Sequence, residues 1–377
     1  MNVLRRLSMS RLLLLCGVVL VVGIGATALA LAVGSGPTPP AKPLAEAIHD
    51  GLSAPKPTGV TARVQFTNHL LEGASLAGGS GGEAGQLSSS PLISGASGRL
   101  WVATDGHARL ELQSEKGDTQ ILWDGKTAEM YDASANTLYR YTPEHPLSTE
   151  TTPGANTGSG SDGSTGTGDK VPTVAEIEEH LAKASTHADI SGATPTDVAG
   201  QAAYTVRFSP RENGGLIAGA ELSWDAVHGN PLRVAIYSTN SPSPAIELAA
   251  TEISYGQPDS SALEFTPPAN AKIQDVKLPS GTSTSGSSSD SQSKPNVTVH
   301  GKGLESIVLA ESPVKAGGEE SGAAQLEGLQ QVSINGTKAS ELPTQLGTLL
   351  TFERAGVRYL MAGSVTPSAI EAFARGL

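Results

Sequence analysis

The sequence predicts an α+β protein in which a few helices pack against a long antiparallel sheet, and three observations favour this class. Apolar and polar residues alternate along most of residues 60–255, as in strands with one buried face. Asp-Gly pairs at 105–106 and 124–125 join successive alternating runs, and this pair is the strongest short-range signal for a hairpin. The helical patterns stand apart from the strands, which is typical of α+β proteins.

The strands follow from local periodicity. After a short helix expected at residues 44–52, the strand expected at 60–66 places Val64 and Phe66 on an apolar face and Arg63 on a polar one. Further strands are expected within residues 99–114, 119–132, 137–142, 202–208, 218–224, 232–238 and 246–255, and each of the first two segments holds a hairpin.

One helix interrupts the strands. Thr173 and Glu176 form a capping-box pattern, in which each side chain hydrogen-bonds to the backbone amide of the other residue. An apolar stripe then recurs at helical spacing through residues 174–184, while Glu178 and Lys183 lie on the other side. The stripe predicts a helix with one face packed against the sheet.

Low-complexity tracts divide the chain into domains. Residues 73–98 and 146–169 are rich in Gly, Ser and Thr, and we expect them to be loops within one domain spanning residues 43–276. A similar tract at 277–295 is expected to link this domain to a small C-terminal domain at 296–377.

The C-terminal domain is expected to be a small α/β unit. It contains apolar runs at residues 306–309, 347–352 and 357–362, and a helix that starts near Thr366. Its roughly 80 residues lie near the lower limit for an independent hydrophobic core.

The N-terminal 34 residues predict a signal-anchor helix. Arg5, Arg6 and Arg11 precede 22 residues, 12–33, that carry no charge and could span the ~30 Å core of a bilayer. Because the positive side stays in the cytoplasm, we expect a single-pass protein inserted in the cytoplasmic membrane, with the bulk of the chain on the extracytoplasmic side. A cleaved signal peptide is the alternative, since small residues recur at 26–32.

Composition excludes several functional classes. The net charge of −12 argues against binding to nucleic acid, which needs clustered Lys and Arg. A single cysteine, Cys16, excludes a disulfide framework and a Cys-based zinc site. Matches to a nucleophile elbow at 78–82 and to dinucleotide-binding spacing at 158–163 lie in Gly/Ser tracts without the flanking strand. His180 and His187 are too few to hold a metal. We therefore expect no catalytic residue, no metal and no cofactor, and thus no enzyme.

What remains is the apolar face of a large sheet. A curled antiparallel sheet must fill its interior with side chains or with a ligand. Two interpretations stay open, core packing against the helices or the lining of a cavity. The candidate lining residues are Val64, Phe66, Val102, Leu110, Leu112, Trp224, Val234 and Ile236.

Two segments carry a resemblance to a known family. Residues 122–136, LWDGKTAEMYDASAN, form a hairpin pattern that ends in Tyr-Asp and a turn, and Trp224 to Val234 form a strand–turn–strand pattern with a Gly-Asn-Pro turn. With the order of elements over residues 43–276, these segments resemble the LolA/RseB-like family of bacterial extracytoplasmic proteins. The resemblance implies a half-open antiparallel β-barrel closed by helices over a hydrophobic cavity that holds acyl chains. Residues 347–365 are similar to the small second domain of RseB-like regulators.

The resemblance and the N-terminal segment together predict a function. We expect a membrane-anchored, non-catalytic protein that binds an acyl lipid or lipoprotein as a carrier does. The alternative is a regulatory module that senses envelope stress and contacts an anti-sigma factor through its C-terminal domain.

Overall fold

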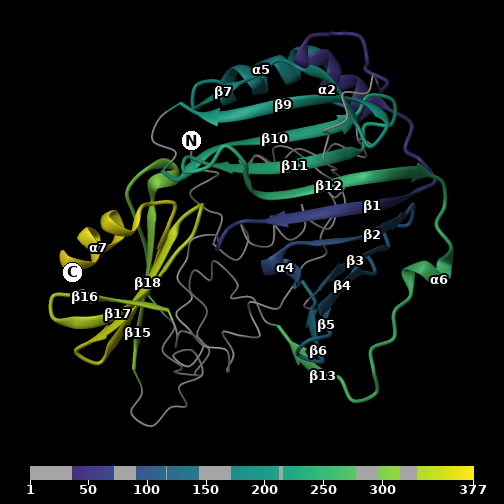
Figure 1. Cartoon of the computed structure of the whole chain (residues 1–377). Coiled ribbons are helices and arrows are strands. Elements are labelled where there is room, and N and C mark those ends of the chain that lie inside the picture. Colours follow the sequence, from purple (N-terminus) through teal and green to yellow (C-terminus); the bar gives the residue numbers. More distant parts are fainter. Residues whose placement is uncertain are drawn as a thin grey trace, which may run out of the picture.

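The structure is a computed structural model. It describes residues 36–71, 91–115, 117–143, 171–211, 215–276, 296–314 and 329–377. These residues form two sheets with helices packed against them (Figure 1), so the predicted α+β class is confirmed.

The larger sheet has 13 strands in the order β13-β6-β5-β4-β3-β2-β1-β12-β11-β10-β9-β7, and β8 pairs with β9 beside this path. The order is open, so the described strands do not close into a barrel. All pairs are antiparallel except β13 with β6, which is parallel. The strands are β1 (Gly59–Asn68), β2 (Ala96–Ala103), β3 (Ala108–Ser114), β4 (Gly117–Trp123), β5 (Ala128–Asp132), β6 (Thr137–Tyr141), β7 (Ala188–Ile190), β8 (Thr194–Val198), β9 (Gln201–Pro210), β10 (Ile217–Asp225), β11 (Pro231–Ser238), β12 (Pro244–Tyr255) and β13 (Lys272–Asp275).

The predicted hairpin turns form as the Asp-Gly pairs indicate. The carboxylate of Asp124 accepts the backbone amides of Lys126 and Thr127 at 2.8 and 2.6 Å, which closes the turn between β4 and β5. Gly106 and Gly125 both have φ +87°, a left-handed conformation that glycine adopts at no steric cost.

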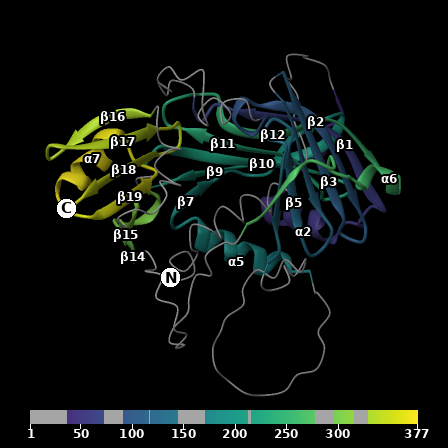
Figure 2. The same cartoon turned by 90° about the horizontal axis from the view of Figure 1, so that it is seen from below.

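In the part of the chain that the structure describes, four helices lie along the large sheet: α2 (Leu44–Ser53), α4 (Pro91–Ser94), α5 (Val174–Ala184) and α6 (Ser260–Leu263). The predicted capping box starts α5, because the Glu176 amide donates to Thr173 Oγ1 at 3.3 Å and the Thr173 amide donates to Glu176 Oε2 at 2.7 Å. Helices α2 and α5 contact each other, and Figure 2 shows them side by side on one side of the sheet.

The chain between β12 and β13 forms a strap across the polar face of the large sheet. Arg109 on β3 fixes it, because the guanidinium donates to the carbonyls of Ala262 and Glu264 at 3.1 and 2.8 Å. Phe265 then packs on Tyr131 of β5, with ring centroids 5.3 Å apart. The strap carries the chain to the far edge of the sheet, where β13 joins β6.

The second sheet has six strands in the order β14-β15-β19-β18-β17-β16. They are β14 (Asn296–His300), β15 (Ile307–Pro313), β16 (Gln330–Ile334), β17 (Thr337–Pro343), β18 (Thr348–Arg354) and β19 (Val357–Gly363), and a 3-10 turn, η2 (Gly303–Glu305), precedes β15. Helix α7 (Pro367–Arg375) buries Ile370 and Ala374 against one face of this sheet. Every pairing in it is antiparallel, so the α/β class expected for the C-terminal domain is not confirmed.

The predicted location in a membrane is contradicted. Across the described ranges, no helix is both long and apolar enough to cross a bilayer. The segment on which the prediction rests, residues 1–34, lies outside the described residues.

Candidate functional site

The eight apolar residues nominated from the sequence all lie on one face of the large sheet. On β1, β2, β3, β10 and β11 this face carries the even-numbered positions, and paired residues share a face. Val64 pairs with Gly98, which pairs with Leu112. Phe66 pairs with Leu248, which pairs with Val234. The strand register therefore places side chains from distant parts of the chain on one continuous apolar face.

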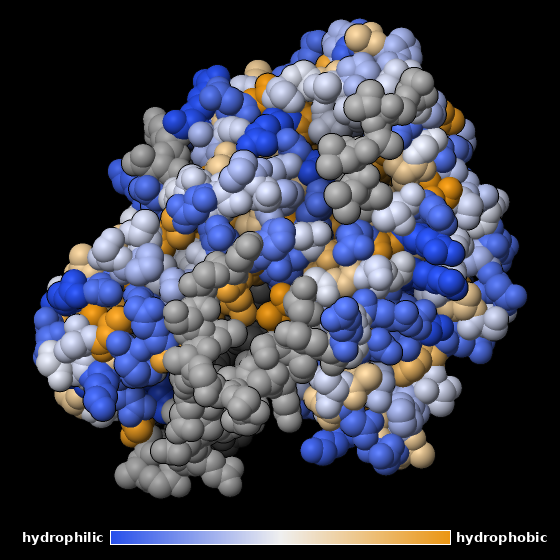
Figure 3. Space-filling view, in the orientation of Figure 1, coloured by the Kyte–Doolittle hydropathy of each residue, from blue (hydrophilic) through white to orange (hydrophobic). Residues whose placement is uncertain are grey.

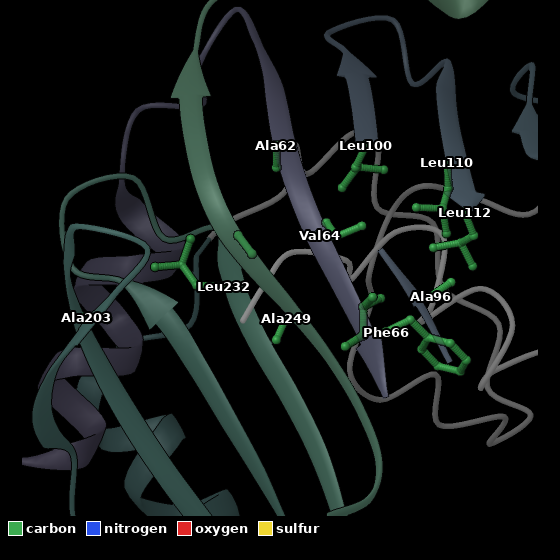
Figure 4. Packing of buried hydrophobic residues seen from close by; sticks show 12 residues of the cluster. Ala62, Val64, Phe66, Ala96, Leu100, Leu110, Leu112, Ala203, Leu232 and Ala249 are labelled. Atoms are coloured by element: carbon green, nitrogen blue, oxygen red, sulfur yellow. The ribbon is translucent and has the colours of Figure 1, made fainter. Parts of the chain in front are cut away.

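Five of the eight are almost inaccessible to solvent and belong to two separate packed clusters. Val64, Phe66, Leu110 and Leu112, each 5% exposed or less, form the first cluster with residues of β2, β11 and β12, and Figure 4 shows their side chains together. Trp224 belongs to the second cluster, with Tyr204 of β9 and Ala47 of α2. Its ring centroid lies 5.9 Å from that of Tyr204. The structure thus does not bring Trp224 together with Phe66.

The other three residues are half buried. Val102 packs against the first cluster. Among the described residues, Val234 and Ile236 belong to neither cluster. Their cross-strand neighbours on the same face include two further half-buried residues, Leu222 of β10, which packs against the second cluster, and Ile246 of β12, which packs against the first. We call these four residues, Leu222, Val234, Ile236 and Ile246, the β11 strip. It is apolar surface that lies between two packed clusters.

A buried carboxylate next to Trp224 holds the end of this face in place. Asp225, 1% exposed, accepts the Tyr255 hydroxyl at 2.5 Å and the amides of Val227 and His228 at 2.6 and 2.8 Å. Burial alone would raise the pKa of Asp225, but these hydrogen bonds hold it below its ordinary value. Val227 and His228 lie between β10 and β11, so the hydrogen bonds that their amides donate to Asp225 fix this turn.

The opposite, polar face carries residues that the sequence reasoning missed. A cavity of about 550 Å³ opens over β1, β2 and β3 and is lined by Arg63, Arg99, Gln65 and Gln113, among others. An adjoining cavity of about 650 Å³ continues along the same strands. Alternation alone assigns Arg63 to this face, but only the register shows that Arg99 lies directly opposite it. On the side shown in Figure 3, hydrophilic residues predominate and hydrophobic ones appear in a few places.

Among the described residues, the remaining sequence patterns contribute no site. Residues 78–82 and 158–163 lie outside the described residues. His180 hydrogen-bonds to the Glu176 carbonyl of its own helix at 2.8 Å. Within the part of the chain that the structure describes, no three His, Cys, Asp or Glu side chains are grouped to hold a metal ion.

Comparisons with known proteins found several solved structures that are similar to this chain. No protein-family model matches the chain, and no curated protein matches it. The chain is similar to the MucA/MucB complex of Pseudomonas aeruginosa, with 14% identity, a TM-score of 0.45, and coverage of 88% of this chain and 96% of that chain. It is also similar to a conserved protein from Thermus thermophilus, with 11% identity, a TM-score of 0.34, and coverage of 62% and 97%.

A LolA superfamily protein from Nitrosomonas europaea is a third structure of this kind, with 8% identity, a TM-score of 0.19, and coverage of 85% and 91%. The structures similar to this chain thus include MucB and a LolA superfamily protein.

Proposed function

We propose that the protein is a carrier-like binding protein, not an enzyme, that holds the acyl chains of a lipid or lipoprotein on the apolar face of its large sheet. The observation that carries this proposal is the β11 strip, whose half-buried side chains lie between two packed clusters. An acyl chain needs apolar area and no directed hydrogen bonds. Each methylene removed from water contributes about 0.8 kcal/mol, before the costs of association.

The two packed clusters flank this strip and support it on both sides. Val64, Phe66, Leu110 and Leu112 are buried on one side of it, and Trp224 is buried on the other. In this proposal Val234 and Ile236 contact the ligand, and Val102 extends the apolar surface along β2. The buried residues hold the curvature of the sheet and do not move when a ligand binds.

Filling the strip tests the proposal. We expect Val234→Phe combined with Ile236→Phe to reduce binding of a fluorescent long-chain fatty acid by at least ten-fold, because the added rings occupy the space of the acyl chain. The measurement is a fluorescence titration of the full chain, with mass spectrometry of solvent extracts to detect lipid that co-purifies.

The matched control is Thr67→Phe, which adds the same ring on the polar face of β1. This variant should bind the fatty acid as the unaltered protein does. Equal affinity in the filled variant, with its far-UV spectrum unchanged, would show that the strip is not the binding site.

A second candidate function rests on the six-stranded sheet. Val297, Val299 and Leu360 are 56%, 65% and 41% exposed. The register places them with Val308 and Ala310 on the face opposite the core, away from α7. An exposed apolar face of this kind is suited to binding another protein. We propose an anti-sigma factor as its partner, in a regulatory module that responds to envelope stress.

The test of this second function uses the extracytoplasmic part of an anti-sigma factor encoded beside the gene. The double variant Val297→Asp, Leu360→Asp should abolish its binding and leave fatty-acid binding unchanged. Gln331→Asp, on the same face at the other edge of the sheet, is the control. If the double variant still binds the anti-sigma factor, this face is not the interface.

A further inference from the structure

Two arginines lie side by side on the polar face of the large sheet, outside the proposed acyl-binding strip. Arg63 of β1 pairs directly with Arg99 of β2, and both side chains are exposed. The Cβ atoms of such cross-strand partners are about 4.5–5.5 Å apart, and like charges in this position destabilise a sheet. The pair is therefore unfavourable unless anionic groups lie close to the two guanidinium groups.

Two described carboxylates lie beside this pair, and neither of them forms an ion pair with Arg99. Glu252 of β12 pairs with Arg63 at 3.0 Å, with both side chains more than half exposed. Glu111 is the cross-strand neighbour of Arg99 on β3, but it pairs with Arg109 at 3.6 Å. Among the residues that the structure describes, Arg99 makes no ion pair. Its charge is available to a ligand.

The arginine pair lies in a cavity that is lined by further hydrogen-bond donors. The cavity of about 550 Å³ is lined by Gln65, Ser97, Gln113 and Thr251 together with the two arginines, and the carboxylate of Glu111, which pairs with Arg109, also lines it. Amide and hydroxyl groups donate to anionic oxygens, and each guanidinium donates two parallel N–H bonds. These donors project from four neighbouring strands, β12, β1, β2 and β3, so the backbone of the sheet fixes their spacing.

We propose that Arg63 and Arg99 form a binding site for a phosphate group, with Ser97, Gln65 and Gln113 as secondary donors. A phosphate has enough oxygens to accept a bidentate pair from each arginine, whereas a carboxylate has only two oxygens to share between them. The phosphate belongs to a free phosphate compound or to a lipid head group. The site lies on the face opposite the β11 strip, so it does not depend on the proposed acyl binding.

The experiment compares Arg99→Gln and Arg63→Gln with Arg211→Gln in the full chain. Arg211 is the control because it is also exposed and is paired with Asp189 at 2.7 Å. Isothermal titration with inorganic phosphate and with glycerol 3-phosphate measures the free compounds. Co-sedimentation with phosphatidylcholine vesicles, with and without phosphatidic acid, whose phosphomonoester has three free oxygens, measures the head group.

We expect both Arg99→Gln and Arg63→Gln to weaken phosphate binding at least ten-fold, and Arg211→Gln to leave it unchanged. Added phosphate should raise the melting temperature of the unaltered protein but not that of Arg99→Gln, since a ligand stabilises only the state that binds it. Without phosphate, Arg99→Gln should melt at the same temperature or higher, because it removes a like-charge contact.

The titrations with free compounds and the co-sedimentation with vesicles together distinguish a free phosphate ligand from a lipid head group. Binding of the free compounds identifies a free phosphate ligand, and a difference seen only with vesicles that contain phosphatidic acid identifies a head group. The proposal is overturned if Arg99→Gln binds every probe as tightly as the unaltered protein does. It is also overturned if Arg211→Gln loses as much affinity, or if the unaltered protein binds none of the probes.

Discussion

Glu341 is a carboxylic acid in the core of the C-terminal sheet. Its side chain is 1% exposed, and Oε1 has no hydrogen-bond partner among the described residues. Its neighbours across the strands are Gln330 and Leu350, and Leu350 is fully buried. Burial raises the pKa of Glu341 above its ordinary value, and the negative charge of Glu371 raises it further. Burial in this core therefore favours the protonated form of Glu341.

The stability of the protein should accordingly depend on pH through this residue. A raised pKa in the folded state gives stability that is complete below the unfolded pKa of about 4.3 and is lost as pH rises through the folded pKa. We expect Glu341→Gln, which keeps the shape but cannot ionise, to gain stability relative to the unaltered protein over this range, by up to about 1.4 kcal/mol per pH unit.

Urea unfolding of both proteins between pH 4 and 8 measures this difference. Glu353→Gln is the control, because that carboxylate is exposed and paired with Arg358 at 2.6 Å. A difference between Glu341→Gln and the unaltered protein that stays constant with pH would contradict the prediction.

At the scale of elements, local patterns predicted the antiparallel meanders and their turns, since alternation and Asp-Gly pairs act over a few residues. The start of β2 was missed. Its residues Ala96, Ser97 and Gly98 belong to a tract expected to be a loop, yet they pair with β1 and β3. A Cβ at Gly98 would lie 1.9 Å from the Glu111 carbonyl oxygen, so glycine is required there by close approach of β3. Composition cannot distinguish this use of glycine from a flexible loop.

The candidate site was also predictable in part, because the alternation of apolar and polar residues acts within each strand. Periodicity assigns each apolar residue to a face of its own strand, and all eight lie on one face of the sheet. The division into two clusters was not predictable, because it depends on α2, whose Ala47 packs with Trp224 and Tyr204. Strands β7, β8 and β13 were also missed. They are short, and β13 lies beside β6 only because the strap carries it there.

At the scale of the whole molecule, two backbone hydrogen bonds between described residues join the regions that carry the two sheets. The Leu216 amide donates to the Ser364 carbonyl at 3.0 Å, and the Gln345 amide donates to the Leu70 carbonyl at 2.9 Å. Gly215, with φ +63°, lies at the first of these contacts, where a Cβ would be 1.7 Å from the Ser364 oxygen. The junction thus depends on a position where only glycine fits.

Gly215→Ala should therefore loosen the junction between the sheets. The backbone conformation costs roughly 1–2 kcal/mol for a residue with a Cβ, and the clash with Ser364 adds to this cost. We expect a larger radius of gyration by small-angle X-ray scattering. Gly200→Ala is the matched control, since Gly200 has φ +74° but nothing within 4 Å of an added Cβ. Equal radii of gyration in the two variants would show that the contact at Gly215 does not hold the sheets together.

The central pairing of β1 with β12 has a consequence for synthesis. Val60 pairs with Tyr255, so β1 is made long before its partner. Ribosomes add about 5–20 residues per second, so the β1 edge waits about 10–40 s before β12 is complete. An unpaired edge is a template for pairing with another chain, and a charged side chain in the edge strand discourages this. Arg63 is a charged, exposed residue in the middle of β1. Its charge would discourage the growing chain from pairing with another chain before the sheet is complete.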